Sequence, residues 1–509
     1  MDNVIERPGE DIERYVCASF TDEGFIDIVV SDNHRAQFSV QNYVSTLQRK
    51  HPGKTNVKFV SFDEVSQFRE ANGIDNQQGD ARENVESQQR VLRYFKQAVE
   101  LGASDIHFTI GRDNSEFTYI EVRVHGELEQ IDCIDKQDGM QLAAAICQGM
   151  CDVTEKQFYP NRQQDGRIKE EFVKPLGIFG ARYSHTPAVG GLYAVMRIIP
   201  DDGNNVPSQE ALGFLPEQIA TTKRILRRPE GIVVLSGPTG SGKSTTLRSL
   251  SSCYLSRAGI SKNGLPRKRL LTIEDPPEGR IPGAVQTPII ADKKDARAVT
   301  LAWLRAISSA LRLDPDAILN GEMRDMDSAM AAINAAMTGH LLMTTLHAND
   351  AISIIERLEI MGINVRLIAD AQLMVGLISQ RLVQRLCPNC KVSYKEEAER
   401  MDEDDRKLIE HYCQSEHVYL RSMEGCEQCF KGVIGRTVIS EVIAPDAKFF
   451  EIYLTRGKAA AKTYWKTNLK GITRNEHLLH YINAGEVDPL AADAICPIDE
   501  DTYTLIKES

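Results

Sequence analysis

One segment of the chain has the residue types and spacing of a phosphate-binding loop. It reads Gly237, Pro238, Thr239, Gly240, Ser241, Gly242, Lys243, Ser244 and Thr245. In such a loop the backbone N–H groups converge on phosphate oxygens, the lysine reaches the β- and γ-phosphates, and the hydroxyl that follows it ligates Mg²⁺. We therefore expect this segment to bind ATP, with Lys243 on the phosphates and Ser244 on the metal. The alternative is a glycine-rich turn that binds nothing.

The residues on either side of the loop favour nucleotide binding over a plain turn. Residues 231–236 form an apolar run with the pattern of a buried strand, and residues 245–250 are typical of a helix. A phosphate-binding loop requires this order of strand, loop and helix, because the positive end of the following helix adds to the field at the phosphates. The order therefore predicts a nucleotide site at this loop.

A second strand candidate, residues 270–276, ends in two carboxylates and a proline. In a doubly wound parallel sheet the carboxyl ends of the strands are where ligands bind. We therefore predict that Glu274 orients or deprotonates the attacking water, with Asp275 and Glu278 as supporting or metal-linked carboxylates. The alternative is a solvated strand end, which this segment taken alone would favour.

Two more strand candidates in this region end in side chains that suit phosphate chemistry. Residues 317–325 contain an apolar strand closed by Gly-Glu, and an acid that closes such a strand holds Mg²⁺ in P-loop ATPases. Glu322 is therefore the predicted magnesium carboxylate. Residues 338–347 form a strand with histidines at both ends. His347 is a candidate contact for the γ-phosphate, although a lone histidine is more often structural.

Two C-x-x-C pairs, Cys387 with Cys390 and Cys426 with Cys429, are separated by 35 residues. Four thiolates in two such pairs match a tetrahedral structural zinc site, with the intervening segment looped out. Redox chemistry and free thiols are the alternatives, but a redox pair needs one C-x-x-C only. Cys413 lies between the pairs as a spare ligand. The remaining cysteines lack ligand spacing and are interpreted as packing residues: Cys17, Cys133, Cys147, Cys151, Cys253 and Cys496.

Length and composition limit the architecture and the partners. A chain of 509 residues is long enough for three or more domains of about 100–200 residues each. The start has no basic segment followed by an apolar one, and no apolar run approaches the ~20 residues needed to cross a bilayer. We therefore expect a cytoplasmic protein that reaches a membrane only through partners. The net charge of −12 opposes non-specific binding to nucleic acid, so no such partner is expected.

The pattern of apolar runs divides the chain further. Residues 1–85 mix short apolar runs with charged stretches and predict a small α/β domain, closed by a polar, glycine-containing boundary at residues 76–84. A helix is expected at residues 91–101, because Gly102 can adopt the left-handed conformation that ends helices. Alternating runs on both sides of a helix at 140–150 predict a strand-rich second domain before the nucleotide domain.

Taken together, these motifs resemble those of one family, the secretion ATPases of type II secretion and type IV pilus assembly. The resemblance extends from about residue 91 to about residue 442. It rests on residues 102–107, 164–168, the phosphate loop, 272–276, 313–316, 321–325, 338–350, 380–388 and 435–436. A shared order of so many motifs is hard to produce by chance.

The resemblance implies an α/β protein in which a RecA-like P-loop ATPase domain follows a PAS-like α+β domain. A small zinc-binding subdomain and an amino-terminal α/β domain complete the predicted fold. The expected segments are 1–85 (partner docking), 86–203 (PAS-like), 204–212 (linker), 213–385 (RecA-like), 386–445 (tetracysteine zinc subdomain) and 446–509 (helical carboxyl-terminal region). ATP would bind between the PAS-like and RecA-like domains, where Arg182 and Arg197 match family arginines that reach over to the phosphates. The alternative for each arginine is a surface cation on a strand.

The resemblance also implies a homo-hexameric ring that uses ATP, Mg²⁺ and structural Zn²⁺ and drives type IV pilus assembly through a platform protein at the inner membrane. The tetracysteine motif is typical of the assembly and secretion branches, so pilus extension is the first expectation. Type II protein secretion is the main alternative, and pilus retraction and DNA translocation are further ones. A ring that binds ATP without hydrolysing it is the non-enzymatic alternative, and the intact Lys243, Glu274 and Glu322 count against it.

Overall fold

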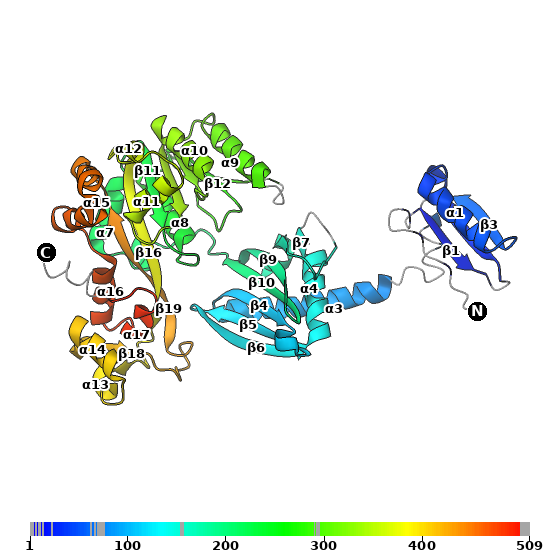
Figure 1. Ribbon diagram of the computed structural model, residues 1–509, viewed down its shortest axis with the longest axis horizontal. Coiled ribbons are helices and arrows are strands. Elements are labelled where there is room, and N and C mark those ends of the chain that lie inside the picture. The colour runs from blue at the N-terminus through cyan, green and yellow to red at the C-terminus, as the bar shows by residue number, and fades with distance from the viewer. Residues whose placement is uncertain are drawn as a thin grey trace. The chain divides into compact units, whose positions relative to one another are not determined.

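The computed structural model describes residues 5, 8, 12, 15–21, 24–61, 64, 65, 68, 77–152, 157–289, 291 and 296–498. Contacts divide the chain into two compact units, Met1–Val91 and Leu92–Ser509. Figure 1 labels many of the elements of both units. Within the described ranges, no helix is both long enough and apolar enough to cross a membrane.

The amino-terminal unit contains a three-stranded sheet covered by a helix. Its elements are β1 (Val16–Phe20), β2 (Ile26–Ser31), α1 (Phe38–Lys50) and β3 (Thr55–Val60). β1 pairs antiparallel with β2, and β2 pairs parallel with β3, so α1 is the crossover that a parallel pair requires. Alternate residues of β2, which are Ile26, Ile28 and Val30, pack with Val40 and Leu47 of α1. The expectation of an amino-terminal α/β domain is confirmed.

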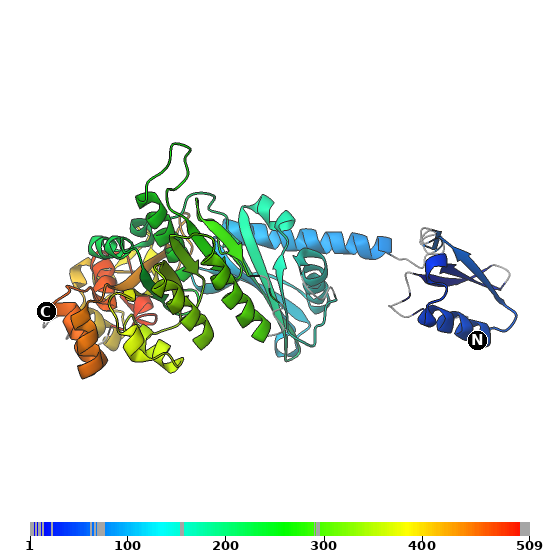
Figure 2. The ribbon, with the colours of Figure 1, turned by 90° about the horizontal axis from the view of Figure 1, so that it is seen from above.

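Helix α3 (Gln77–Glu100) appears as one continuous light-blue helix in Figure 2. It ends before Gly102, whose φ of +65° is the left-handed conformation expected there. It begins earlier than predicted, because the polar stretch from residue 77 is helical where we expected a boundary; residue 76 lies outside the described residues. The physical reason is that Gln, Glu and Arg, which are frequent in this stretch, are good helix formers.

An antiparallel sheet of seven strands follows α3, in the order β6-β5-β4-β10-β9-β8-β7. Its elements are β4 (Ala103–Ile110), β5 (Phe117–Val124), β6 (Glu127–Asp135), α4 (Lys136–Ala145), β7 (Cys151–Asp152), β8 (Gln164–Ile168), α5 (Glu170–Val173), β9 (Ile178–Ala188) and β10 (Gly191–Pro200). The helix expected at 140–150 starts earlier, and its end, Ile146–Met150, is a π-helical turn. Alternate residues of β5 are buried, which matches the alternating sequence from which it was predicted.

A mostly parallel sheet, the phosphate-loop sheet, has the order β13-β12-β14-β15-β11-β16-β19, and only β16 with β19 is antiparallel. Its strands are β11 (Gly231–Ser236), β12 (Leu270–Glu274), β13 (Val285–Pro288), β14 (Ala317–Asn320), β15 (Leu341–Leu346), β16 (Met374–Leu386) and β19 (Val433–Ile443). Because β11, β12, β14 and β15 are parallel, their carboxyl ends meet at one edge. The predicted site residues follow these strand ends.

Helices cover both faces of the phosphate-loop sheet. They are α6 (Gln209–Leu212), α7 (Pro216–Ile225), α8 (Lys243–Arg257), α9 (Ala296–Ala310), α10 (Met326–Met337), α11 (Ser353–Ile360) and α12 (Val365–Ile368). Along β11, Ile232 and Val234 pack in a cluster with α9, α10 and α11, whereas Val233 and Leu235 pack in another with α7 and α8. Alternation along a strand places these two pairs on opposite faces. The doubly wound α/β class is therefore confirmed.

The chain after β16 contains an insertion, here called the cysteine insertion (residues 387–432), and a helical end. The insertion holds β17 (Val392–Ser393), α13 (Tyr394–Glu397), α14 (Glu403–Tyr412) and β18 (Tyr419–Leu420), and α15 (Ala447–Thr467), α16 (Arg474–Asn483) and α17 (Pro489–Asp493) follow β19. β19 falls within the predicted zinc segment 386–445, but it pairs with β16 and forms the edge of the phosphate-loop sheet. The predicted domain boundaries stay predictions, and residues 499–509 lie outside the described residues.

His477 of α16 ties the carboxyl-terminal helices to the phosphate-loop sheet. It is fully buried, accepts the N–H of Ser440 at Nδ1 (3.0 Å), and its Nε2 lies 2.9 Å from the carbonyl oxygen of Gly213. Because Nδ1 is an acceptor, the imidazole is neutral and carries its proton on Nε2. Burial lowers the pKa of His477 from 6.5 to about 4.

We expect the protein to lose stability as the pH falls from 6.5 to about 4. In this window His477 takes up a proton in the unfolded chain but not in the folded one, so protonation favours unfolding; the full shift corresponds to roughly 3 kcal/mol. Thermal unfolding measured across this window should show the loss, and His477→Gln should remove that part of the pH dependence. His480→Gln, on the exposed side of the same helix, should keep the wild-type profile. An unchanged profile in His477→Gln would contradict the assignment.

Candidate functional site

The phosphate loop lies between β11 and α8 at the carboxyl edge of the phosphate-loop sheet. Gly237 has a φ of +153°, and a Cβ at this position would lie 2.6 Å from the carbonyl oxygen of Gln380. Gly242 precedes α8 in the left-handed conformation, with a φ of +80°. Both positions therefore require glycine. Lys243 is the first residue of α8, so the unpaired N–H groups of the first helical turn start at the loop.

Gln380 of β16 holds the loop from the neighbouring strand. Its side chain is fully buried and donates from Nε2 to the carbonyl oxygen of Ser241 at 2.6 Å. Ser241 in turn donates from Oγ to the carbonyl oxygen of Pro238 at 2.9 Å. From the sequence Gln380 had no assigned role, because only the pairing of β11 with β16 brings it to the loop. Its place in the Gln-Arg motif of residues 380–388 was the one available signal.

Lys243 lies inside the loop with two carboxylates nearby. Its Nζ donates to the carbonyl oxygens of Gly237 at 2.8 Å and Pro238 at 3.0 Å. Burial lowers the pKa of Lys243, and the charges of Glu322 and Glu278 oppose this shift. The structure thus brings two of the predicted carboxylates to the lysine. They favour its charged form, which is the form that binds phosphate.

Glu322 follows β14 and is held between two basic side chains. Its Oε2 accepts from Arg324 Nε at 3.0 Å, and its Oε1 lies 3.3 Å from His347 Nε2. Glu322 and His347 follow adjacent parallel strands, β14 and β15, which is why they meet at the same edge. The predicted magnesium carboxylate and the predicted γ-phosphate contact are therefore neighbours, and Arg324 orders the loop that carries Glu322.

Glu274 closes β12 and organises the loop that follows. It accepts from Thr272 Oγ1 at 2.6 Å and from Gln286 Nε2 at 3.2 Å. Gln286 Nε2 also donates to the carbonyl oxygen of Gly279 at 2.9 Å. Burial raises the pKa of Glu274, and the hydrogen bonds from Thr272 and Gln286 partly offset this. A raised pKa makes the ionised carboxylate a better proton acceptor, and its role as the base stays a prediction.

The two predicted arginines have different partners. Arg182 of β9 donates from Nη2 to Glu278 Oε1 at 3.0 Å and to the carbonyl oxygen of Asp275 at 3.3 Å. It therefore crosses from the antiparallel sheet to the loop after β12. Arg197 of β10 instead pairs with Asp105 Oδ1 at 3.0 Å within its own sheet. The structure brings Arg182 to the candidate site and leaves Arg197 paired within its own sheet.

The residues of this edge fit a nucleoside triphosphate with Mg²⁺. Lys243 and the first turn of α8 supply positive charge and N–H donors for phosphate oxygens. Ser244 supplies a hydroxyl and Glu322 supplies carboxylate oxygens, which are ligand types that Mg²⁺ takes. Arg182 Nε is buried, and no described residue accepts a hydrogen bond from it. An anionic ligand would satisfy this donor.

The four predicted zinc cysteines form one cluster in the cysteine insertion. The Sγ atoms of Cys387, Cys390, Cys426 and Cys429 all lie within 4.8 Å of one another. Sγ separations are 3.7 Å for Cys387 to Cys426 and 3.6 Å for both Cys390 and Cys426 to Cys429. Tetrahedral zinc with Zn–S bonds of about 2.3 Å requires separations of about 3.8 Å, so the cluster fits zinc. Cys413 is not part of it, because its side chain packs in the core of the insertion, where burial raises its pKa to about 12.

The β5–β6 hairpin of the antiparallel sheet docks on the cysteine insertion. Arg421, whose side chain is 9% exposed, binds both carboxylate oxygens of Glu127, with Nη2 3.0 Å from Oε2. The hydrogen bond from Arg421 is the main cause of the lowered pKa of Glu127. Lys431 Nζ lies 2.6 Å from Glu129 Oε2. Arg421 and Lys431 flank residues 426–429, so the loop that holds half of the cysteine cluster also holds the antiparallel sheet.

A family model described as "Type II/IV secretion system protein" matches residues 81–484. The chain belongs to this family. Members similar to it include the type II secretion system ATPase E of Vibrio cholerae, which is 34% identical over 363 residues, 70% of this chain and 65% of that protein. The type IV pilus assembly ATPase PilB of Thermus thermophilus is 33% identical over 392 residues, 77% of this chain and 40% of that protein. The chain thus spans less than two thirds of the length of these relatives.

Solved structures of two ATPases share the fold of this secretion-family member. The pilus retraction motor PilT with bound ADP aligns with a TM-score of 0.52 and 24% identity, over 81% of this chain and 98% of that one. The Legionella pneumophila ATPase DotB aligns with a TM-score of 0.51 and 21% identity, over 79% and 94% of the two chains. At these identities the likeness concerns the fold, and it agrees with the predicted architecture.

Proposed function

We propose that this chain is an ATP hydrolase that powers assembly of a type IV pilus at the inner membrane. The observation that carries the proposal is the convergence of Lys243, Glu322 and His347 at the carboxyl edge of one parallel sheet, at the phosphate loop. These are the cation, the carboxylate and the imidazole that phosphoryl transfer uses. Membership of the secretion family and the likeness to a pilus assembly ATPase support the kind of work that is done.

The chain's own residues divide the chemistry among them. Lys243 and the first turn of α8 bind and orient the β- and γ-phosphates. Glu274 accepts the proton of the attacking water. Arg182 and His347 neutralise the charge that develops on the γ-phosphate. The buried Nε donor of Arg182 and the place of His347 beside Glu322 support these two roles.

Two metals are part of the proposal. Mg²⁺, which Ser244 and Glu322 would hold, supplies positive charge at the phosphates. Zn²⁺ would close the cysteine insertion and take no part in the reaction. Its proposed ligands are Cys387, Cys390, Cys426 and Cys429, and their Sγ separations support it.

Hydrolysis would be coupled to motion through Arg182. This side chain joins the antiparallel sheet to Glu278. Loss of the γ-phosphate would remove negative charge next to the ion pair of Arg182 with Glu278. The contact between the two domains would then weaken, and one domain could swing against the other. Arg197 would join it on the phosphates after release from Asp105. A homo-hexameric ring would combine such swings, and a platform protein of the inner membrane would receive the work on its cytoplasmic side.

Type II protein secretion is the second candidate function. It is favoured by the likeness to the secretion ATPase of Vibrio cholerae, which matches this chain as well as the pilus assembly ATPase does. Pilus assembly and secretion share every motif named above, so they differ in cargo and not in chemistry. The net charge of −12 counts against DNA translocation.

Replacing Lys243 with Ala on the native gene tests the proposal. The change removes the phosphate-binding ammonium, so we expect the purified variant to lose Mg²⁺-dependent ATP turnover and the cells to lose surface filaments. If turnover is lost but the filaments are retained or increased, pilus assembly is not the function, and secretion or retraction takes its place as the proposed function. If the Lys243 variant still hydrolyses ATP, the assignment of this loop as the ATP site is wrong. Arg257→Ala, at the exposed far end of the same helix, is the matched control.

A further inference from the structure

Arg248 of α8 is a buried cation five residues after Lys243. Its side chain is 7% exposed, and Nη2 lies 2.7 Å and 2.8 Å from the two carboxylate oxygens of Asp202. Asp202 lies in the segment that connects β10 to α6, between the antiparallel sheet and the phosphate-loop sheet. One ion pair thus joins the helix that begins at the phosphate loop to the linker between two sheets.

The same guanidinium also holds the loop after β12. Arg248 Nε donates to the carbonyl oxygen of Arg280 at 3.1 Å. The group lies against Gly279, where φ is +134° and a Cβ would come within 2.5 Å of Arg248 Cζ. Glu278, the preceding residue, is the partner of Arg182. A single side chain therefore connects α8, the linker and the loop that positions Glu278.

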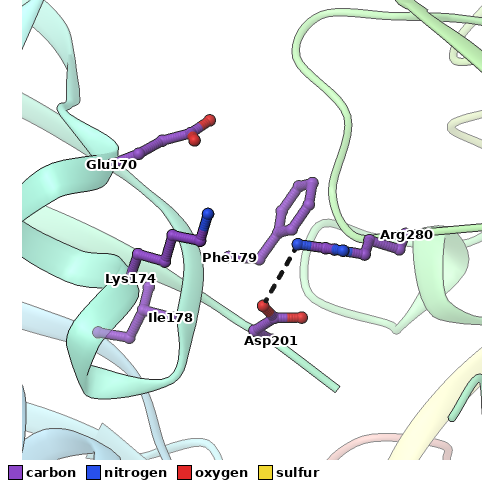
Figure 3. Close-up of a pocket in the computed structure, with 6 residues that line it drawn as sticks. All are labelled: Glu170, Lys174, Ile178, Phe179, Asp201 and Arg280. Atoms are coloured by element: carbon purple, nitrogen blue, oxygen red, sulfur yellow. Dashed lines mark ion pairs between the residues drawn. The ribbon is translucent and has the colours of Figure 1, made fainter. Parts of the chain in front are cut away.

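A neighbouring ion pair differs from this one. Asp201 and Arg280 approach to 3.9 Å, and the Arg280 side chain is half exposed. Figure 3 shows the pair in a small polar pocket of about 40 Å³, which has room for water. A long pair with a half-exposed arginine contributes little to stability. The pair of Arg248 with Asp202 is shorter, its guanidinium is buried, and its Nη2 contacts both carboxylate oxygens, so it holds the two residues more closely.

The burial of the Arg248 guanidinium is better explained by where the side chain lies than by a gain in stability. Moving charged side chains out of water has a large desolvation cost. Apolar residues can therefore often replace a buried ion pair without loss of stability. The pair of Arg248 with Asp202 lies where the linker meets the phosphate-loop helix. Its two-oxygen geometry holds those two segments in one defined arrangement.

We propose that Arg248 is a positioning residue that couples the phosphate-loop helix to the interdomain linker and places Glu278 for its contact with Arg182. The proposal rests on the proposed ATP hydrolysis and names the side chain through which nucleotide acts on the linker. Movement of α8 displaces Asp202 and the backbone of Arg280 together, because one guanidinium binds both. The state of the phosphate site is thereby linked to the position of the linker.

The variant Asp202→Asn tests this coupling while it leaves the phosphate loop in place. We expect a roughly 3- to 30-fold loss of kcat for ATP, with the Kd for a fluorescent ADP analogue within about twofold of the wild type. Arg248→Lys keeps the charge but has no second nitrogen to donate to the carbonyl oxygen of Arg280, so it should show the same split. Asp201→Asn is the matched control and should keep the wild-type kcat. A wild-type kcat in Asp202→Asn, or equal losses of kcat and ADP affinity, would overturn the proposal.

A second measurement does not depend on turnover. Amide hydrogen exchange of residues 200–207 should slow when ADP binds the wild type and should not respond to ADP in Asp202→Asn. If the wild type binds ADP but does not hydrolyse ATP, the proposed function fails, and this response still decides the coupling. An ADP response of equal size in both proteins would refute the coupling.

Discussion

Replacing Glu322 with Gln is expected to slow ATP turnover roughly 10²- to 10⁴-fold while nucleotide binding persists. The carboxylate follows β14 at the phosphate loop, and its charge acts on Lys243. The amide keeps the shape of the side chain but loses the charge that, in the proposed function, would hold Mg²⁺ against the phosphates. The expected loss equals about 3–5 kcal/mol of transition-state stabilisation. The phosphate loop itself is unchanged, so ADP should still bind.

Phosphate release and ADP-analogue binding, measured on the same preparations, separate these two effects. Asp327→Asn is the matched control, because Asp327 is an exposed carboxylate in the first turn of α10, five residues after Glu322. Turnover of the Glu322 variant within tenfold of the wild type would contradict the magnesium role. Turnover lost in the Asp327 variant as well would show that the assay reports damage to the fold.

Removal of metal is expected to unfold the cysteine insertion. Structural zinc contributes roughly 10–16 kcal/mol to small zinc domains at neutral pH. Burial raises the pKa of Cys429, but the N–H groups of Cys426 and Gly432 bring it down to about 7, so its thiolate is accessible near neutral pH. A strong chelator, or Cys429→Ser, should therefore release one zinc per chain and lower the unfolding temperature by roughly 10 °C or more.

The effect of metal loss should spread to the antiparallel sheet. Arg421 and Lys431 lie in the same loop as two of the cysteines, and they hold Glu127 and Glu129 of the β5–β6 hairpin. Zinc content by atomic emission and thermal unfolding of the same samples provide the measurement. Cys133→Ser, which removes an exposed thiol from β6, is the matched control. A metal-free wild-type protein with an unchanged unfolding temperature would rule out structural zinc.

Local sequence patterns predicted most of the elements around the candidate site. β11 matches the strand expected at residues 231–236, and α8 begins at Lys243, within the predicted loop. β14 and β15 end just before Glu322 and His347, as expected. These elements are predictable because strands buried on both faces produce continuous apolar runs, and glycines mark the turns between elements.

The partners of the site residues could not be predicted in the same way. Gln380 holds Ser241 from 139 positions away, and Arg248 binds Asp202 from 46 positions away. The resemblance to the family led us to expect Arg197 at the phosphates, but the antiparallel register of β10 with β4 places it opposite Asp105. No periodicity within one sequence reports such contacts, because they depend on how strands and sheets pack.

The sequence by itself determined which chemistry is available to this protein. The phosphate loop, the acids at strand ends and the two C-x-x-C pairs each depend on residue types within a few positions of one another. Only the tertiary structure decided which of these groups meet. The parallel order of β14, β15 and β11 brings Glu322 to His347 and its charge to Lys243, and the crossing from the antiparallel sheet adds Arg182. The spacing of residues within a turn determines what that turn can bind. Pairing of distant segments costs chain entropy, and burial of the apolar sheet faces offsets this cost. The pattern of burial therefore decides which distant residues become partners.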